Sequence, residues 1–286
     1  DMLKLILIDP KRVELTLYNG IPHLITPVIT DNKKVLGALK WAVGEMERRY
    51  EVLSGRGCRD IQAYNSQVNA KKGEELMPYI VVVIDELADL MAAYGHEIEG
   101  AVVRLAQMAR AVGVHLVLAT QRPSVEVITG LIKANITSRA AFAVASHIDS
   151  RTILDSAGAE KLLGSGDMLF ISADASKPKR IQGTFVSDKE VKKVVNFVKS
   201  HQIEPVVDDE ESSVLAPARP LEIKVSPLDF ERAGDAEELE DELMPQAKEV
   251  IMQAGKASAS LLQRRLKVGY ARAARLLDIL EAQGLI

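Results

Sequence analysis

The chain has 286 residues, is 47% hydrophobic and 27% charged, and carries a formal net charge of −4. This composition excludes fibrous and disordered classes, and the length suits one large domain with a small one. The single cysteine, Cys58, excludes an internal disulfide, and no apolar run reaches the ~18–20 residues of a membrane span. We expect a soluble chain from a reducing compartment. Its opening within a strand, without an initiator methionine, indicates a fragment of a longer protein.

The first 120 residues alternate apolar runs with segments of helical periodicity. Short apolar runs predict buried strands, and apolar residues three and four apart predict helices. The strands are predicted at 3–9, 79–84 and 114–120, and the helices at 33–53 and 97–112, with Gly113 ending the latter and loops around a short helix at 54–77.

The same alternation continues to about residue 200. Strands are predicted at 140–145, 166–172 and 180–186, and helices at 150–158 and 188–200. Buried runs that alternate with helices are typical of a mostly parallel sheet that helices cover on both faces. We therefore predict an α/β domain over residues 1–204.

The composition changes after this domain. Between Asp208 and Glu242 there are 13 acidic and 3 basic residues, three prolines and no sustained periodicity. Because like charges repel, residues 205–241 are predicted to form a flexible acidic linker, part of which could order against a domain.

Residues 242–286 read as three helices in helix-turn-helix order, with Ser258 or Ser260 capping the second. The stretch 253–276 has no acidic residue and six basic ones: Lys256, Arg264, Arg265, Lys267, Arg272 and Arg275. A basic helix face suits the DNA major groove, where Arg binds guanine. The alternative is a solvated basic face on a small interaction module.

Polar side chains follow the first three predicted strands: Asp9, then Asp85 and Glu86, then Thr120, Gln121 and Arg122. Parallel sheets bind ligands at the carboxyl ends of their strands. The three clusters are therefore predicted to share one site.

Two adjacent carboxylates after a buried strand suggest ATP hydrolysis, which needs a magnesium ion on the phosphates and a base for the attacking water. Asp85 could hold the ion, Glu86 could act as the base, and a polar residue among Thr120, Gln121 and Arg122 could sense the γ-phosphate. The alternative for these three residues is a strand exit before Pro123. The alternative for the two carboxylates is a strand that ends in a polar pair at the start of a helix. No phosphate-binding loop of the form GxxxxGK[ST] accompanies them, since neither the glycines at 164–166 nor Gly255 have the required context.

Arg139 and Arg151 could each stabilise transition-state charge at a neighbouring subunit's nucleotide. The usual role of such an arginine is a salt bridge or a surface position, and the spacing leaves both interpretations open.

Several stretches resemble one family. "LILIDPKRVELTLYNGIPHLITPVITD", "PYIVVVIDELADLM", "RLAQMARAVGVHLVLATQRPSVEVITGLIKANI" and "GAEKLLGSGDML" resemble the motor of the FtsK/SpoIIIE DNA translocases, and "LLQRRLKVGYARAARLLDILEAQGLI" resembles their γ domain. The resemblance covers almost the whole chain apart from the acidic linker.

The resemblance implies a RecA-like P-loop NTPase motor that forms a homo-hexameric ring around double-stranded DNA and moves along it with ATP and Mg²⁺. It implies a winged-helix γ domain that recognises DNA orienting sequences. It also implies a bacterial protein of chromosome segregation at the division septum, on the cytoplasmic side of the inner membrane. Membrane segments absent here would anchor it, and recombinases or division proteins would be further partners.

Carried over by motif, Asp85 would be the magnesium residue, Glu86 the catalytic base, Gln121 the γ-phosphate sensor and Arg139 the trans-acting finger. The candidate DNA contacts are Arg122 and Lys133 in the motor and Arg264, Arg265, Lys267, Arg272 and Arg275 in the γ domain.

The chain departs from the family pattern at both ends. In the family a P-loop strand and helix precede "LILIDPK", and wing strands follow the last helix. We therefore expect this chain to bind ATP poorly and to be inactive alone. The competing interpretations are a conjugative coupling ATPase or HerA-like DNA-pumping ATPase, and a non-catalytic DNA-binding regulator.

Overall fold

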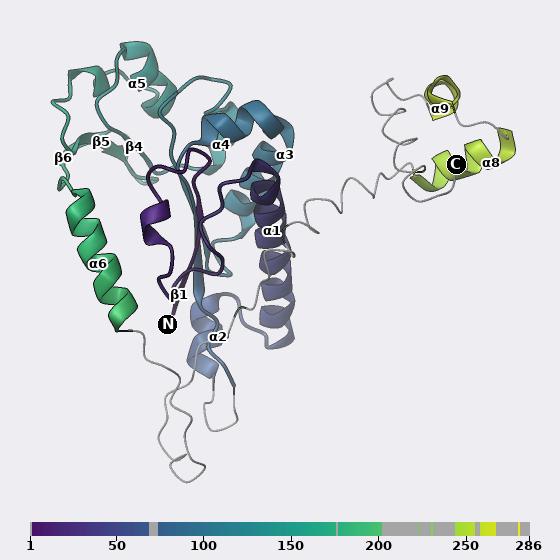
Figure 1. The fold of residues 1–286 in the computed structure, drawn as a ribbon, viewed down its shortest axis with the longest axis horizontal. Helices are drawn as coiled ribbons and strands as arrows, with labels where there is room; N and C mark the ends of the chain where they lie inside the picture. The colour runs from purple at the N-terminus through teal and green to yellow at the C-terminus, as the bar shows by residue number, and fades with distance from the viewer. Residues whose placement is uncertain are drawn as a thin grey trace, which may run out of the picture. The chain divides into compact units, whose positions relative to one another are not determined.

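The computed structural model describes residues 2–68, 74–175, 177–201, 223, 230, 244–254, 258–266 and 280. The chain divides into two compact units, Asp1–Phe230 and Glu231–Ile286, which Figure 1 draws. The predicted linker, residues 205–241, lies outside the described residues except for Ile223 and Phe230.

A three-stranded parallel sheet in the order β1-β2-β3 forms the centre of the first unit. Its strands are β1 (Leu3–Ile8), β2 (Tyr79–Ile84) and β3 (Val114–Leu118). The register pairs Ile8 with Ile84 and Ile84 with Leu118, so the three carboxyl ends lie at one edge. The three strands predicted in this part of the sequence are confirmed.

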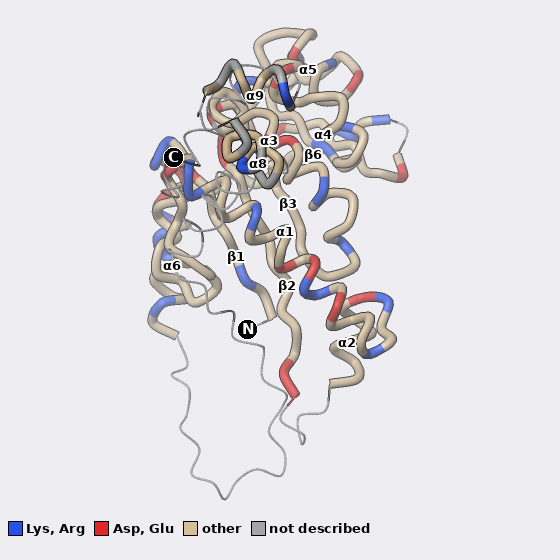
Figure 2. The backbone as a smooth tube through the Cα atoms, turned by 90° about the vertical axis from the view of Figure 1, so that its right-hand side faces the viewer, with Lys and Arg blue, Asp and Glu red and all other residues tan. Residues whose placement is uncertain are grey.

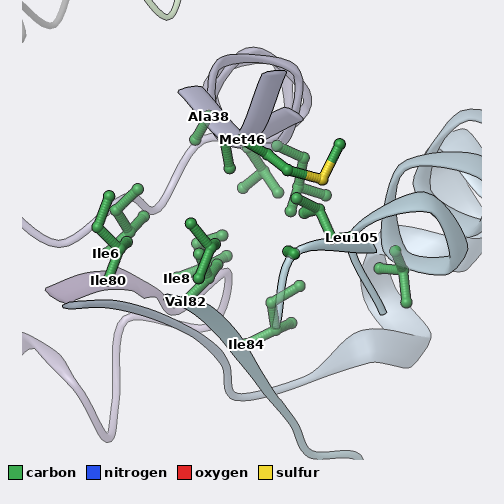
Figure 3. Packing of buried hydrophobic residues seen from close by; sticks show 14 of the residues in the cluster. Ile6, Ile8, Ala38, Met46, Ile80, Val82, Ile84 and Leu105 are labelled. Carbon is green, nitrogen blue, oxygen red and sulfur yellow. The ribbon is translucent and has the colours of Figure 1, made fainter. Parts of the chain in front are cut away.

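Helices α1 (Asn32–Gly55) and α3 (Leu87–Met108) contact each other over the sheet, while α2 (Ile61–Gln67) follows α1. Figure 3 shows Ala38 and Met46 of α1 facing Ile6, Ile8 and the inward residues of β2, with Leu105 of α3 beside them. Asp31 caps α1 by accepting from the Lys33 N–H at 2.9 Å. Helix α3 begins ten residues before the predicted start because it includes an earlier helical segment, which Glu86 caps and which joins the predicted one across a kink at Tyr94, where φ is −142° and ψ is 45°.

The two faces of the parallel sheet are not equally covered in the described chain. Along β2, Ile80, Val82 and Ile84 are buried, whereas the alternate residues are only half-buried. On β3, Val117 is 49% exposed. Leu7 of β1, which alternates with the inward Ile6 and Ile8, is 4% exposed, so the second face is covered at β1 and is more open at β2 and β3 among the residues described. The prediction that both faces are covered is therefore met in full on one face and in part on the other.

The later strands correct the prediction of a mostly parallel sheet. β4 (Arg139–Ala141), β5 (Asp167–Ile171) and β6 (Lys179–Gln182) form a separate antiparallel sheet. A parallel pair needs a crossover of about a dozen residues or more, and only residues 172–178 connect β5 to β6. Helix α5 (His147–Leu154) contacts β4, whereas α4 (Gly130–Asn135) contacts α3 and α6 (Asp188–Ser200) contacts the short 3-10 helix at Thr16–Tyr18.

A buried ion pair joins α1 to the turn before β3. Arg49 is fully buried, and its guanidinium donates to the Glu45 carboxylate at 2.7 Å and to the Val112 carbonyl at 2.8 Å. Arg48 also donates to Glu45 from a more exposed position, at 2.7 and 2.8 Å. Burial alone would raise the pKa of Glu45, but the hydrogen bonds from Arg48 and Arg49 outweigh it and lower that pKa.

The second unit is described at α8 (Met244–Ala254) and α9 (Ala259–Leu266), which contact each other. Ala247, Ile251, Leu262 and Leu280 are buried. The Ser258 carbonyl accepts from the Leu261 and Leu262 N–H groups, which places Ser258 at the start of α9 as predicted. Most of the predicted third helix lies outside the described residues. No helix in the described parts of the chain is long and apolar enough to cross a membrane.

Candidate active site

The three polar clusters meet at the carboxyl edge of the parallel sheet. The Asp85 N–H donates to the Ile8 carbonyl at 3.0 Å, and the Ala119 N–H donates to the Ile84 carbonyl at 2.8 Å. These bonds extend the strand pairing past the last strand residues. Asp9, Asp85 and Thr120 therefore follow neighbouring strands at one edge, as the sequence predicts.

Glu86 is fully buried, and donors from both flanking strand ends surround its carboxylate. Lys11 donates to one oxygen at 2.8 Å, and the Thr120 hydroxyl donates to the other. The Gln121 N–H lies 3.2 and 3.3 Å from the two oxygens, and the Ala88 N–H completes the set at 3.4 Å. Because a carboxylate offers about four lone-pair sites, these four donors saturate it.

The same donors keep Glu86 ionised. Burial on its own would raise the pKa of this carboxyl, but hydrogen bonds from Lys11, Thr120 and Gln121 outweigh it and lower the pKa. An ionised carboxylate only accepts hydrogen bonds, so a water can reach Glu86 once a donor is displaced. Lys11 is a donor on a long side chain that is 30% exposed.

Asp9 and Asp85 both carry a buried oxygen without a hydrogen-bond partner among the described residues. Asp9 is fully buried, and its other oxygen accepts from the Leu15 N–H at 3.0 Å. Burial, followed by the charges of Asp9, Glu14 and Glu86, raises the pKa of Asp85. Unpaired buried carboxylate oxygens beside one another fit a hard divalent cation, which prefers oxygen ligands.

Gln121 and Arg122 are exposed at the rim of this site. Gln121 binds Glu86 through its backbone N–H, so the Gln121 side chain is available to bind a ligand. Figure 2 shows basic and acidic residues interspersed along the described chain.

Among the described residues, no group of three or more His, Cys, Asp or Glu side chains is placed to hold a metal ion. The pair of carboxylates, Asp9 and Asp85, would therefore need phosphate or water as further ligands of the ion.

Lys133 and Arg139 belong to a second cluster, centred on Asp155. The Asp155 carboxylate accepts from the Lys133 ammonium and from the Arg139 guanidinium, each at 2.7 Å. Arg139 also donates to the Ile153 carbonyl at 2.9 Å. In this conformation Arg139 makes an ion pair within its own chain, and Arg151 lies exposed on α5.

The predicted DNA contacts of the second unit are described only in part. Arg264 and Arg265 lie on α9, and Arg265 is exposed. Lys267, Arg272 and Arg275 lie outside the described residues.

The FtsK/SpoIIIE family model matches residues 1–125, and the Ftsk gamma domain model matches residues 238–286. The DNA translocase FtsK of Caldanaerobacter subterraneus subsp. tengcongensis is 56% identical over 99% of this chain. The DNA translocase SftA of Bacillus subtilis is 52% identical over the same share. The chain belongs to the FtsK/SpoIIIE family. It spans 37% and 28% of the lengths of these two relatives.

Solved structures agree with this family assignment. The pCW3 conjugation coupling protein TcpA, solved as a monomer with ATPγS, is 29% identical with a TM-score of 0.61. The alignment covers 69% of this chain and 56% of TcpA. The cytoplasmic domain of the Type VII secretion ATPase EccC from Thermomonospora curvata is 25% identical, with a TM-score of 0.59 over 71% of this chain and 25% of EccC. The predicted α/β P-loop NTPase motor with a C-terminal γ domain is confirmed.

Within this family member, sequence reasoning missed two partners of the predicted residues. Lys11 stands two positions after Asp9, in a turn that reaches the Glu86 carboxylate 75 residues further along. The "DPK" sequence directly after a buried strand was the available signal. Asp155, which binds both Lys133 and Arg139, stands directly after α5 and belongs to none of the polar clusters that follow the parallel strands. The sequence therefore gave no reason to select it.

Proposed function

We propose that this chain is part of an ATP-driven translocase of double-stranded DNA that acts in bacterial chromosome segregation at cell division. The observation that carries the proposal is the buried Glu86 at the end of β2, held by groups from both neighbouring strand ends. An oriented, ionised carboxylate is what a base for an attacking water requires. The relatives named DNA translocase support the substrate class.

In the mechanism that we infer, Glu86 accepts the proton of the attacking water, and the Thr120 hydroxyl and Gln121 N–H fix the orientation of its carboxylate. Lys11 binds the Glu86 carboxylate at rest and leaves one acceptor site when it moves away. The exposed Gln121 side chain would hydrogen-bond the γ-phosphate. Positioning of this kind provides most of the catalysis in phosphoryl transfer.

Asp85 would hold Mg²⁺, and Asp9 beside it would be the second carboxylate. The unpaired buried oxygens of both residues fit that ion. Bound Mg²⁺ would neutralise the charge that develops on the phosphates.

The remaining residues would connect hydrolysis to DNA. Arg139 would act as the trans finger of a hexameric ring once it leaves Asp155, and Lys133 would then be free for DNA phosphates together with Arg122. The basic residues of the C-terminal domain, Arg265 among them, would read the orienting sequence, with residues 205–241 as its linker. The complete protein would act at the septum, on the cytoplasmic side of the membrane.

Hydrolysis by the complete protein tests the proposal. Glu86→Gln should abolish DNA-stimulated ATP hydrolysis while nucleotide and DNA binding remain. Glu97→Gln, an exposed glutamate on the same helix, is the matched control and should hydrolyse ATP as the wild type does. Normal hydrolysis by Glu86→Gln would overturn the base assignment. An absence of ATP hydrolysis in the wild type, with and without DNA, would favour a non-catalytic DNA-binding regulator.

A further inference from the structure

Phe230 lies in the acidic segment between the two domains, yet it is only 1% exposed. Its ring meets the Trp41 ring edge-on, with centroids 5.9 Å apart and an interplanar angle of 72°. Phe230 belongs to the same hydrophobic core as the inward residues of α1, and Ile223 packs against that core as well. Two residues of this acidic segment, Ile223 and Phe230, are therefore packed on the hydrophobic core of the first unit.

The backbone of α1 is shaped for this contact. A Cβ added to Gly37 would lie 1.7 Å from the Phe230 carbonyl oxygen, which is closer than any side chain tolerates. Glycine within a helix is unfavourable by about 1 kcal/mol relative to alanine. Glycine at position 37 is nevertheless explained, because any side chain there would collide with the Phe230 backbone.

Gly44 provides an internal comparison. Because Gly37, Trp41 and Gly44 are spaced four and three residues apart, they lie on one stripe of α1. A Cβ on Gly44 would meet nothing within 4 Å. The two glycines therefore share a helix and a stripe but differ in whether Phe230 covers them.

We propose that Gly37 and Trp41 form a docking site on α1 for Phe230, and that this contact anchors the acidic segment and shortens the tether of the C-terminal domain. Met244, where α8 begins, follows Phe230 by 14 residues and follows Ser200, where α6 ends, by 44. At most ~3.5 Å per residue, the tether can then span about 50 Å instead of about 150 Å. The docking of Phe230 does not depend on the proposed function. Its consequence for DNA recognition, which is to keep the C-terminal domain close to the motor, does rest on that function.

Trp41 is the only tryptophan in the chain, so its fluorescence reports on the docking site directly. In the full chain, Phe230→Ala should shift the Trp41 emission to longer wavelength than in the wild type and raise the acrylamide quenching constant of Trp41. Gly37→Ala should do the same because its methyl group displaces the Phe230 backbone. Gly44→Ala should leave both readings at wild-type values. Circular dichroism melting of the three variants is the control, and it should show that the first unit remains folded.

Small-angle scattering then measures the tether. Phe230→Ala and Gly37→Ala should increase the maximum dimension and the radius of gyration, and Gly44→Ala should not. The docking site is overturned if Gly37→Ala and Phe230→Ala leave Trp41 fluorescence unchanged. If fluorescence changes but the dimensions do not, the anchoring role is overturned. Neither result depends on ATP or DNA, so the proposed function stands or falls separately.

Discussion

The buried Glu45–Arg49 pair gives the sharpest stability prediction. Replacing Glu45 by Leu leaves a fully buried guanidinium without its carboxylate, because the Val112 carbonyl then becomes its one remaining described partner. Removal of one partner of a buried pair costs about 3–5 kcal/mol. Arg49→Met should cost less, about 1–3 kcal/mol, because Glu45 keeps Arg48 and the main loss is the donor to Val112.

The double variant separates charge burial from packing. Glu45→Leu with Arg49→Met replaces the pair by apolar groups, an exchange that is often close to neutral. It should therefore be more stable than Glu45→Leu alone, with a coupling energy of about 2 kcal/mol or more. Arg48→Met, at the exposed end of the same network, is the control and should cost no more than about 1 kcal/mol.

Urea denaturation followed by circular dichroism measures these differences. For a unit of about 200 residues, a loss of 3 kcal/mol lowers the melting temperature by roughly 6–12 °C. Strict additivity of the two single substitutions, or a Glu45→Leu cost below about 1 kcal/mol, would refute the reasoning.

Three further predictions concern the site and the second sheet. Lys11→Met in the complete protein should lower kcat for DNA-stimulated hydrolysis by about tenfold or more with little change in KM, because the Glu86 carboxyl loses the hydrogen bond and the charge from Lys11 that lower its pKa and keep it ionised. Lys11→Arg should restore much of the rate, and the exposed Lys189→Met should have no effect. Asp9→Asn and Asp85→Asn should each weaken Mn²⁺ binding about tenfold or more in electron paramagnetic resonance titrations, while Glu14→Gln, which removes a nearby charge but neither orphaned oxygen, should not. Arg180 and the Leu163 N–H lower the pKa of Asp167 to about 2, so its stabilising contribution is complete above its ordinary pKa of 3.8 and is lost as the pH falls toward 2. Asp167→Asn should therefore melt below the wild type at pH 7 and together with it near pH 2, and a constant difference at both pH values would contradict the assignment.

The catalytic edge could be predicted from the sequence because its signals are local. Each polar cluster stands directly after an apolar run, and the parallel arrangement follows from the alternation of runs and helices. This reasoning placed Asp85, Glu86 and Gln121 at one edge, which the structure confirms. Their individual roles in hydrolysis stay predictions.

The contacts that the sequence did not reveal are those made across long separations. Lys11 contacts Glu86, 75 residues away, and Asp155 contacts Lys133 and Arg139, 22 and 16 residues away, only after tertiary folding brings these segments together. The antiparallel second sheet was predictable from the short β5–β6 connection, which the emphasis on alternating helices obscured. Phe230 was obscured by its acidic surroundings, since composition averages conceal a single buried aromatic residue.

The most direct test of the central claim is movement along DNA by the complete protein. We predict that the wild type displaces a third strand from a triplex placed at the end of a long duplex when ATP and Mg²⁺ are present, and that Glu86→Gln binds the same duplex but leaves the triplex intact. Triplex displacement by Glu86→Gln at the wild-type rate, or its absence in a wild type that hydrolyses ATP, would contradict the account.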